Sequence, residues 1–204
     1  MGSQLQRAVE VMDRLRSPGG CPWDAEQTHD SLARYLLEET YELLEAIETN
    51  DRALLREELG DLLLQVLFHA RLAAESDEPF DIEDVAGDLA DKLVRRHPHV
   101  FSSADRSDAA AVNENWERQK IAEKGRTSVL DGVPIAQPSL ALAAKLIARA
   151  ERAGLDVTPG TEDEIGERLF AVAQEAVAAG IDPEGALRRT TLAYRAAVRD
   201  AESS

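Results

Sequence analysis

The sequence predicts an all-α protein, most simply a helix bundle with a helical C-terminal extension. Apolar side chains recur at three- and four-residue intervals along most of the 204-residue chain, which is the period of an amphipathic helix. No convincing run of alternating apolar and polar residues indicates a strand. Helices packed on helices around shared cores are the architecture that such a pattern favours.

Eight helical segments follow from this periodicity, separated by cap-forming residues and prolines. The start of the second segment is open: Asp24 with Gln27 resembles a capping box, whereas Asp30 is an equally good start. We expect Asn50 and Asp51 to cap the third segment. The expected helices cover about 4–16, about 24 or 30 to 49, about 52–76, from PFDIEDV to Pro98, about 106–120, 139–153, 162–179 and 183–202.

A turn-rich segment, GRTSVLDGVPIAQPS, separates the helices into two groups. We therefore expect two helical domains, one over 1–125 and the other over 126–204. In the second group, Thr161 with Glu164 forms another capping box, and Gly180 is suited to end a helix before Asp182 and Pro183.

Composition excludes several classes of protein. A net charge of -16, from 39 acidic and 23 basic residues, argues against non-specific nucleic-acid binding, because the chain would repel a phosphate backbone. The same charge fits a protein that uses divalent cations to approach anionic substrates. Cys21 is the only cysteine, so an intrachain disulfide is impossible and a reducing cytoplasm is the expected location. We expect no membrane segment, because no apolar run approaches about 18 residues.

The helix predicted to end near Thr49 carries several glutamates on more than one side. At about 100° per residue, Glu38 and Glu45 lie nearly opposite its apolar face, and Glu42 lies on the flank. Glu39 lies at the edge of the apolar arc, and Glu39 and Glu42 are close enough to act as a pair. A solvated face and half of a metal site explain this helix equally well.

The next helix is different, because its acids interrupt an apolar stripe. The stripe consists of Leu54, Glu58, Asp61, Gln65, Phe68 and Leu72. The remaining sides are also rich in leucine and valine, and a helix that is apolar nearly all round is expected to be buried. Buried carboxylates require partners, and Arg56 and Arg71 lie on other sides of this helix. A metal shared with the preceding helix is therefore the favoured explanation.

EETYE (38–42) followed by ELGD (58–61) fits the pattern EExxE…ExxD. Four further segments accompany it in order: GCPWDAEQTHDSL, DKLVRRHPHVF, NWERQK and SVLDGVPIAQPSLALAAKL. Together these segments resemble those of MazG-type nucleoside triphosphate pyrophosphohydrolases. The resemblance covers about residues 5–150.

The resemblance implies a four-helix-bundle fold and hydrolysis of nucleoside triphosphates between the α and β phosphates, giving a nucleoside monophosphate and pyrophosphate. Transferred by position, Glu39, Glu42, Glu58 and Asp61 would bind Mg²⁺, with Mn²⁺ as a substitute, and Glu38 would orient or deprotonate the attacking water. The resemblance also implies a homodimer whose substrate pocket is bordered by both subunits.

Basic and aromatic residues are candidates for contacts with the nucleotide: Lys92, Arg95, Arg96, Lys120 and Trp23. Without the resemblance, the cations of DKLVRRHPH are better explained as a charged helix end that interacts with the helix dipole. Trp23 fits stacking on a base and packing over the bundle end equally well. The four histidines show no compact metal-binding pattern, and most are expected to be structural or exposed.

EELGDLLLQV (57–66) is echoed by DEIGERLFAV (163–172), so that Glu58 aligns with Glu164 and Asp61 with Glu167. The helix before this echo contains no EExxE pattern. We therefore expect the second repeat to lack a complete metal site and to serve packing or assembly.

Three functions remain open at this point. The first is a broad pyrophosphohydrolase that removes unwanted nucleotides from the pool. The second is a narrower enzyme of the same superfamily, acting on dUTP or another single nucleotide. The third is a catalytically silent assembly or regulatory module.

Overall fold

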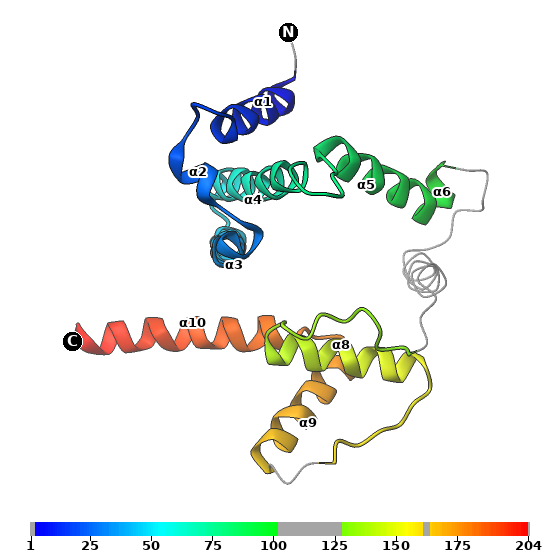
Figure 1. The fold of residues 1–204 in the computed structure, drawn as a ribbon. Helices are drawn as coiled ribbons and strands as arrows, with labels where there is room; N and C mark the ends of the chain where they lie inside the picture. Colours follow the sequence, from blue (N-terminus) through cyan, green and yellow to red (C-terminus); the bar gives the residue numbers. More distant parts are fainter. Residues whose placement is uncertain (1–2, 102–127, 161–163, 204) are drawn as a thin grey trace. The chain divides into compact units, whose positions relative to one another are not determined.

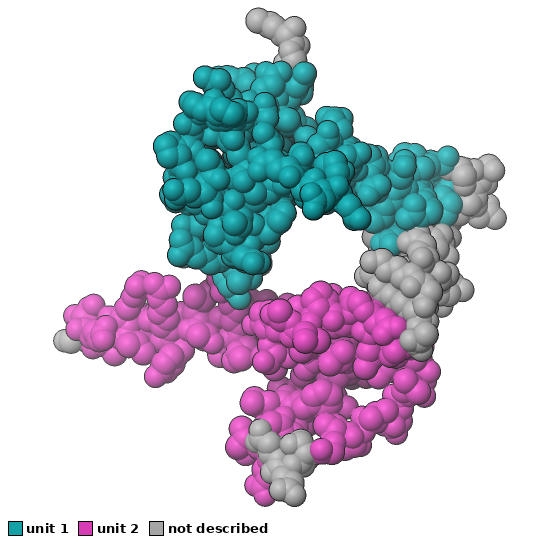
Figure 2. All heavy atoms as spheres, viewed as in Figure 1, with its two compact units in different colours: residues 1–107 teal, residues 108–204 magenta. Residues whose placement is uncertain are grey.

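The computed structural model of the chain describes residues 3–101, 128–160 and 164–203. Every regular element in these ranges is helical, so the all-α prediction is confirmed. The chain divides into two compact units, Met1–Ser107 and Asp108–Ser204 (Figure 2). The predicted boundary between residues 125 and 126, like the helix expected over 106–120, lies outside the described residues.

Six helices form the described part of the first unit (Figure 1): α1 (Gln4–Arg16), α2 (Pro22–Glu26), α3 (His29–Thr49), α4 (Arg52–Ala73), α5 (Ile82–Arg96) and α6 (Pro98–Phe101). Helices α3 and α4 share the most extensive interface among the described elements. Only Asn50 and Asp51 connect them, and His29 near the start of α3 contacts His69 near the end of α4. The two helices therefore run antiparallel as a helical hairpin.

Local capping explains where the hairpin begins and turns. The Thr28 side chain accepts a hydrogen bond from the Ser31 backbone N–H, and Ser31 reciprocates, which makes a capping box for α3. The box expected at Asp24 and Gln27 is therefore wrong, because the chain breaks between α2 and α3. Asn50 ends α3 in the left-handed conformation at φ 55°, so it caps α3 rather than α4. Asp51 caps α4, as predicted.

The core of this unit joins α1 to the hairpin. Met12, Leu32, Leu67 and Phe68 are buried together, from three different helices. Two salt bridges reinforce the same junction: Arg71 Nε lies 2.8 Å from Asp13, and Arg16 lies 2.9 Å from Glu75. Helix α1 is thus fixed against the C-terminal half of α4.

Helix α4 is buried over only part of its surface, which corrects the expectation of burial all round. Glu58, Gln65, Leu67 and Phe68 are buried by α1 and α3. Several other positions are exposed: Leu59 is 52% exposed, and Leu63, Leu64 and Val66 are exposed to a lesser degree. Leu63 and Leu64 line a groove together with residues of α1 and are partly covered by it, whereas Leu59 and Val66 lie outside this groove.

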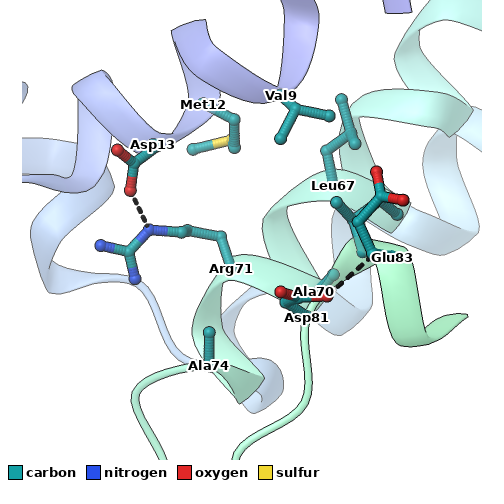
Figure 3. A pocket seen from close by; sticks show the side chains of 10 residues that line it. Val9, Met12, Asp13, Leu67, Ala70, Arg71, Ala74, Asp81 and Glu83 are labelled. Carbon is teal, nitrogen blue, oxygen red and sulfur yellow. Dashed lines mark hydrogen bonds and ion pairs between the residues drawn. The ribbon is translucent and has the colours of Figure 1, made fainter. Parts of the chain in front are cut away.

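A cavity of about 320 Å³ lies where α1, α4 and α5 meet (Figure 3). Val9, Met12 and Leu67 provide much of its apolar wall, and the Arg71–Asp13 salt bridge lies at one end. Both partners of that salt bridge are already satisfied. The cavity contains none of the acids of the hairpin, so it is separate from the site described below.

The described part of the second unit contains α8 (Ser139–Arg152), α9 (Glu164–Ala178) and α10 (Pro183–Glu202), each in contact with the other two. The helix end predicted at Gly180 is confirmed, because Gly180 has φ 70°, and Asp182 then caps α10 with Pro183 in its first turn. Arg149 is buried and donates hydrogen bonds to the carbonyls of Val129 and Asp131. The capping box expected at Thr161 includes a residue outside the described ranges.

Candidate metal centre

Three carboxylates converge in the middle of the hairpin. Glu39 projects from α3, and Glu58 and Asp61 project from the facing turn of α4. One carboxylate oxygen of each residue lies within 4.8 Å of the other two. Within the described ranges this is the only group of three or more potential metal-ligating side chains. We call these residues the acid cluster.

The most buried member of the acid cluster is Glu58, at 7% exposure, whereas Glu39 and Asp61 are half-buried. The Oε2 atom of Glu58 is fully buried and accepts no hydrogen bond from the described residues. A buried carboxylate oxygen without a partner is unfavourable, because it has lost its hydration without replacement. The cluster therefore needs a proton or a cation at this position.

Electrostatics support the same conclusion. Burial raises the pKa of Glu39 above its ordinary value, and the charge of Asp61 and a hydrogen bond with Glu42 raise it further. Burial also raises the pKa of Glu58, followed by the charges of Glu42 and Asp61. The charges that shift these two groups are all acidic, so no cation among the described residues offsets their repulsion.

The donor set suits a hard divalent cation. Carboxylate oxygens are the ligands preferred by Mg²⁺ and Mn²⁺, and the acid cluster contains no sulfur or imidazole ligand. The unpartnered Oε2 of Glu58 supplies one acceptor that such an ion would satisfy. The residues present therefore fit a divalent metal ion.

The two remaining acids of the EETYE segment lie on exposed positions of α3. Glu42 is near the acid cluster, since it contributes to the raised pKa values of both Glu39 and Glu58. Glu38 lies outside the group of three. The structure thus brings together Glu39, Glu58 and Asp61, with Glu42 beside them, and leaves Glu38 on the solvent side.

The predicted nucleotide contacts are distributed over other elements. Lys92, Arg95 and Arg96 lie on α5, where Lys92 is half-buried, Arg95 exposed and Arg96 buried. Trp23 on α2 is 49% exposed, and its ring meets Tyr35 and Phe68 edge-on at centroid distances of 5.9 and 6.4 Å. Trp23 therefore packs over one end of the hairpin and remains about half exposed. Lys120 lies outside the described residues.

Residues that the sequence reasoning did not treat as functional continue the buried stripe of α4. Gln65 follows Asp61 by one helical turn, and His69 follows Gln65 by another. Both have a buried side-chain atom without a hydrogen-bond partner among the described residues, namely Gln65 Oε1 and His69 Nε2. The position of Gln65 in a leucine-rich stripe is the signal in the sequence that could have found it. The pairing of His29 with His69 can be recognised only from the geometry of the hairpin.

The second unit does not reproduce the acid cluster in its described part. Glu164 and Glu167 lie in the first turn of α9 and are exposed. No third acid among the described residues joins them. Their alignment with Glu58 and Asp61 is therefore a likeness of sequence pattern and not of surroundings.

None of the helices in the described ranges has the combination of length and apolarity that crossing a membrane requires.

Comparison with known proteins gives the chain its family. Residues 27–101 match the MazG nucleotide pyrophosphohydrolase domain, a segment that includes the whole acid cluster. The chain is 55% identical over 206 residues to an uncharacterized 26.1 kDa protein of Streptomyces cacaoi, covering 98% of this chain and 84% of that protein.

Two named relatives extend the likeness. The chain is 49% identical to a nucleoside triphosphate pyrophosphohydrolase of Mycobacterium tuberculosis, covering 98% of this chain but only 59% of that protein. It is 42% identical to the protein of the same name in Escherichia coli, covering 88% of this chain and 70% of that protein. The chain therefore belongs to the MazG nucleotide pyrophosphohydrolase family.

Proposed function

We propose that the chain hydrolyses nucleoside triphosphates between the α and β phosphates and requires a divalent cation, with Mg²⁺ as the first candidate and Mn²⁺ as a substitute. The observation that carries this proposal is the acid cluster, whose three carboxylates approach within 4.8 Å on the buried side of the hairpin. The names of the mycobacterial and Escherichia coli relatives support the substrate class. Because the chain spans 59% of the mycobacterial relative, the activity of that whole protein is a proposal for this chain.

The proposal assigns metal binding to Glu39, Glu58 and Asp61, with Glu42 as a fourth ligand from the exposed flank of α3. A bound divalent cation would offset the negative charge that develops on the phosphate oxygens as the anhydride bond breaks. The side chains have a complementary task, which is to hold the triphosphate and the attacking water in line. The rigid α3–α4 hairpin suits that task, since both helices are fixed by core contacts.

Glu38 is proposed to orient the attacking water and to accept its proton. It is adjacent in sequence to Glu39, but it lies on a more exposed side of α3 and outside the acid cluster. A base that does not bind metal remains available to accept a proton. In the overall step, water adds to the triphosphate, the bond between the α and β phosphate groups breaks, and a nucleoside monophosphate and pyrophosphate separate.

Cations and an aromatic ring are proposed to hold the rest of the substrate. Lys92, Arg95 and Arg96 would pair with the distal phosphates, and Lys120 would assist them. Trp23 remains about half exposed, as stacking on a base requires. Its edge-on packing against Tyr35 and Phe68 would keep the ring in a fixed orientation.

We also propose that two copies of the chain associate. The exposed apolar side of α4, which includes Leu59, Leu63 and Val66, supports this proposal, because contiguous apolar residues on a helix face favour association. A homodimer should elute and scatter light at twice the 22.3 kDa mass of the chain. The single cysteine keeps a reducing compartment such as the cytoplasm as the predicted location.

The test is incubation of the protein with a panel of nucleoside triphosphates and Mg²⁺, followed by identification of the products. Nucleoside monophosphate and pyrophosphate from many bases would support a role in cleaning the nucleotide pool. Turnover of dUTP alone would indicate the narrower enzyme, and absence of turnover would indicate a silent module. Release of orthophosphate and a nucleoside diphosphate would contradict the proposed bond specificity.

A further inference from the structure

The buried side of α4 carries a line of polar side chains that extends beyond the acid cluster. At about 100° per residue, Glu58, Asp61, Gln65 and His69 fall within one narrow arc of the helix. Gln65 is only 4% exposed, less than Glu58 at 7%. Its Oε1 atom is fully buried and has no hydrogen-bond partner among the described residues. Gln65 therefore requires an explanation that the acid cluster does not provide.

Packing alone does not explain a glutamine at this position. Buried amide oxygens are nearly always hydrogen-bonded in folded proteins, because an unpaired one loses its interaction with water. The neighbouring core positions of α4 carry Leu67 and Phe68. An apolar residue of similar length, such as methionine, would fill the same volume without an unpaired oxygen. The amide is thus suited to a partner that the described part of the chain does not itself contain.

The next turn of α4 repeats this pattern. The Nδ1 atoms of His29 and His69 lie 2.7 Å apart, and the two rings are parallel within 3°. This hydrogen bond occupies one nitrogen of His69, whereas its Nε2 is buried without a partner among the described residues. Gln65 and His69 therefore present two unpaired atoms on successive turns of α4, on the side that carries the acid cluster.

We propose that Gln65 binds a sugar hydroxyl of the nucleoside triphosphate and makes the enzyme selective for the sugar. This inference rests on the proposed function, which places the phosphates at the acid cluster. Gln65 lies four residues beyond Asp61, about 6 Å along the helix axis. In a nucleotide the sugar follows the α phosphate directly, separated only by the 5′ oxygen and carbon. A substrate held by its phosphates at Asp61 thus places its sugar about one turn away.

The chemistry of the amide matches a hydroxyl group. A sugar hydroxyl both donates and accepts, and a glutamine amide offers an oxygen acceptor and two N–H donors. A site built to bind a hydroxyl discriminates strongly against an analogue that lacks it, because the buried amide is then left unpaired.

The test compares ribo-, 2′-deoxy- and 2′,3′-dideoxynucleoside triphosphates of one base in the full chain with Mg²⁺. We expect kcat/KM of the wild type to fall at least about tenfold on loss of the contacted hydroxyl. For the Gln65→Met variant, the kcat/KM values for the same two nucleotides should differ by no more than about threefold. Gln6→Met, at an exposed position of α1, is the matched control and should retain the wild-type ratio.

Thermal unfolding separates this role from a structural one. If Gln65 serves the substrate, Gln65→Met removes an unpaired buried amide, and its Tm should equal or exceed that of the wild type. A lower Tm with an unchanged sugar ratio would show that the amide is structural and would overturn the inference. Gln65→Leu, which also removes the amide, provides the second variant if Gln65→Met does not fold, and its kcat/KM values for the two nucleotides should likewise differ by no more than about threefold.

The outcomes also separate this inference from the function on which it rests. If the wild type hydrolyses the triphosphates but treats all three sugars alike, only the role of Gln65 is overturned. The same holds if Gln65→Met and Gln65→Leu fold and keep the wild-type sugar ratio. If the wild type hydrolyses none of the triphosphates, both the proposed function and the role of Gln65 fail.

Discussion

The chain carries a similar pair of acids on two helices, α4 and α9, but the structure surrounds the two pairs differently. On α4, Glu58 is buried and Glu39 from the facing helix joins it and Asp61. On α9, Glu164 and Glu167 are exposed, and no third acid from the described neighbours joins them. Two acids spaced three residues apart are therefore only half of the proposed metal site, and the helix that faces them decides whether a third acid joins them.

The facing helices explain the difference. Helix α3 presents Glu39 and Glu42 to α4 from the middle of its length. Helix α8, which packs against α9, is rich in alanine and leucine, and its one acid, Glu151, lies in its last turn. The buried charge of α8 is Arg149, which is already bonded to the carbonyls of Val129 and Asp131. The second unit thus keeps the helix packing without the convergence of carboxylates.

The largest expected effect is on the acid cluster, where Glu39 completes the pair of acids on α4. Asp61→Asn should lower metal-dependent turnover of a nucleoside triphosphate at least about 100-fold, because it removes one charged oxygen ligand while preserving shape. Helical content measured by circular dichroism should stay at the wild-type level, since Asp61 is only half-buried. The matched control is Glu167→Gln on α9, which should retain activity. Comparable losses in both variants would contradict the distinction between the two helices.

The second effect is the stability conferred by the metal. A ligand that binds only the folded state at 100 times its Kd stabilises it by about 2.7 kcal/mol, which corresponds to several degrees in Tm. Mg²⁺ should therefore raise the Tm of the wild type and of the Glu164→Gln variant. Glu58→Gln should remove this increase, because Glu58 is the buried member of the acid cluster. If Mg²⁺ raises the Tm of Glu58→Gln as much as that of the wild type, the ion binds at another position.

A third and smaller effect concerns how α4 is fixed against α1. Hydrogen bonding from Arg16 lowers the pKa of Glu75 below its ordinary value of 4.5. A lowered folded-state pKa means that the contribution to stability is present above about pH 4.5 and is lost as the pH falls below it. Glu75 is 40% exposed, so Glu75→Gln should cost less than about 1 kcal/mol at pH 7.

Thermal unfolding between pH 7 and pH 3 measures this effect. The Glu75→Gln and wild-type curves should converge as the pH falls, because protonation of Glu75 removes its ion pairs with Arg16 and Arg71. Glu175→Gln on α9 is the control at an exposed position and should follow the wild type throughout. A constant gap between Glu75→Gln and wild type down to pH 3 would exclude the ion pair as its cause.

Sequence patterns predict this fold well where local interactions dominate. Helical periodicity locates α1, α8 and α10, and the caps at Asp51, Gly180 and Asp182 are recognisable from residue type alone. The break between α2 and α3 is harder to predict because Asp24 and Thr28 are both good cap residues, and only the fold selects Thr28. Periodicity overestimates the burial of α4 because it reports apolar faces and not what covers them.

The candidate site is predictable in part. The interruption of an apolar stripe by Glu58 and Asp61 indicates, from residue order alone, that these acids need partners. The approach of Glu39 and the pairing of His29 with His69 depend on the antiparallel register of the hairpin, which spacing along one helix does not define. Gln65 is visible in the stripe, but its unpaired oxygen depends on how the surrounding side chains pack.

The smallest expected effect is the sharpest test of the comparison. Replacing Glu164 and Glu167 together with alanine should leave turnover within about twofold of wild type, because both side chains are exposed and belong to no described group of three ligands. The change in Tm should be small as well, since exposed substitutions usually shift stability by about 0.5 kcal/mol or less. A parallel Glu58→Ala and Asp61→Ala double variant should be inactive under the same assay. If the α9 double variant folds normally and still loses most of its activity, the second unit takes part in catalysis, and sequence likeness between the two helices reflects a shared role after all.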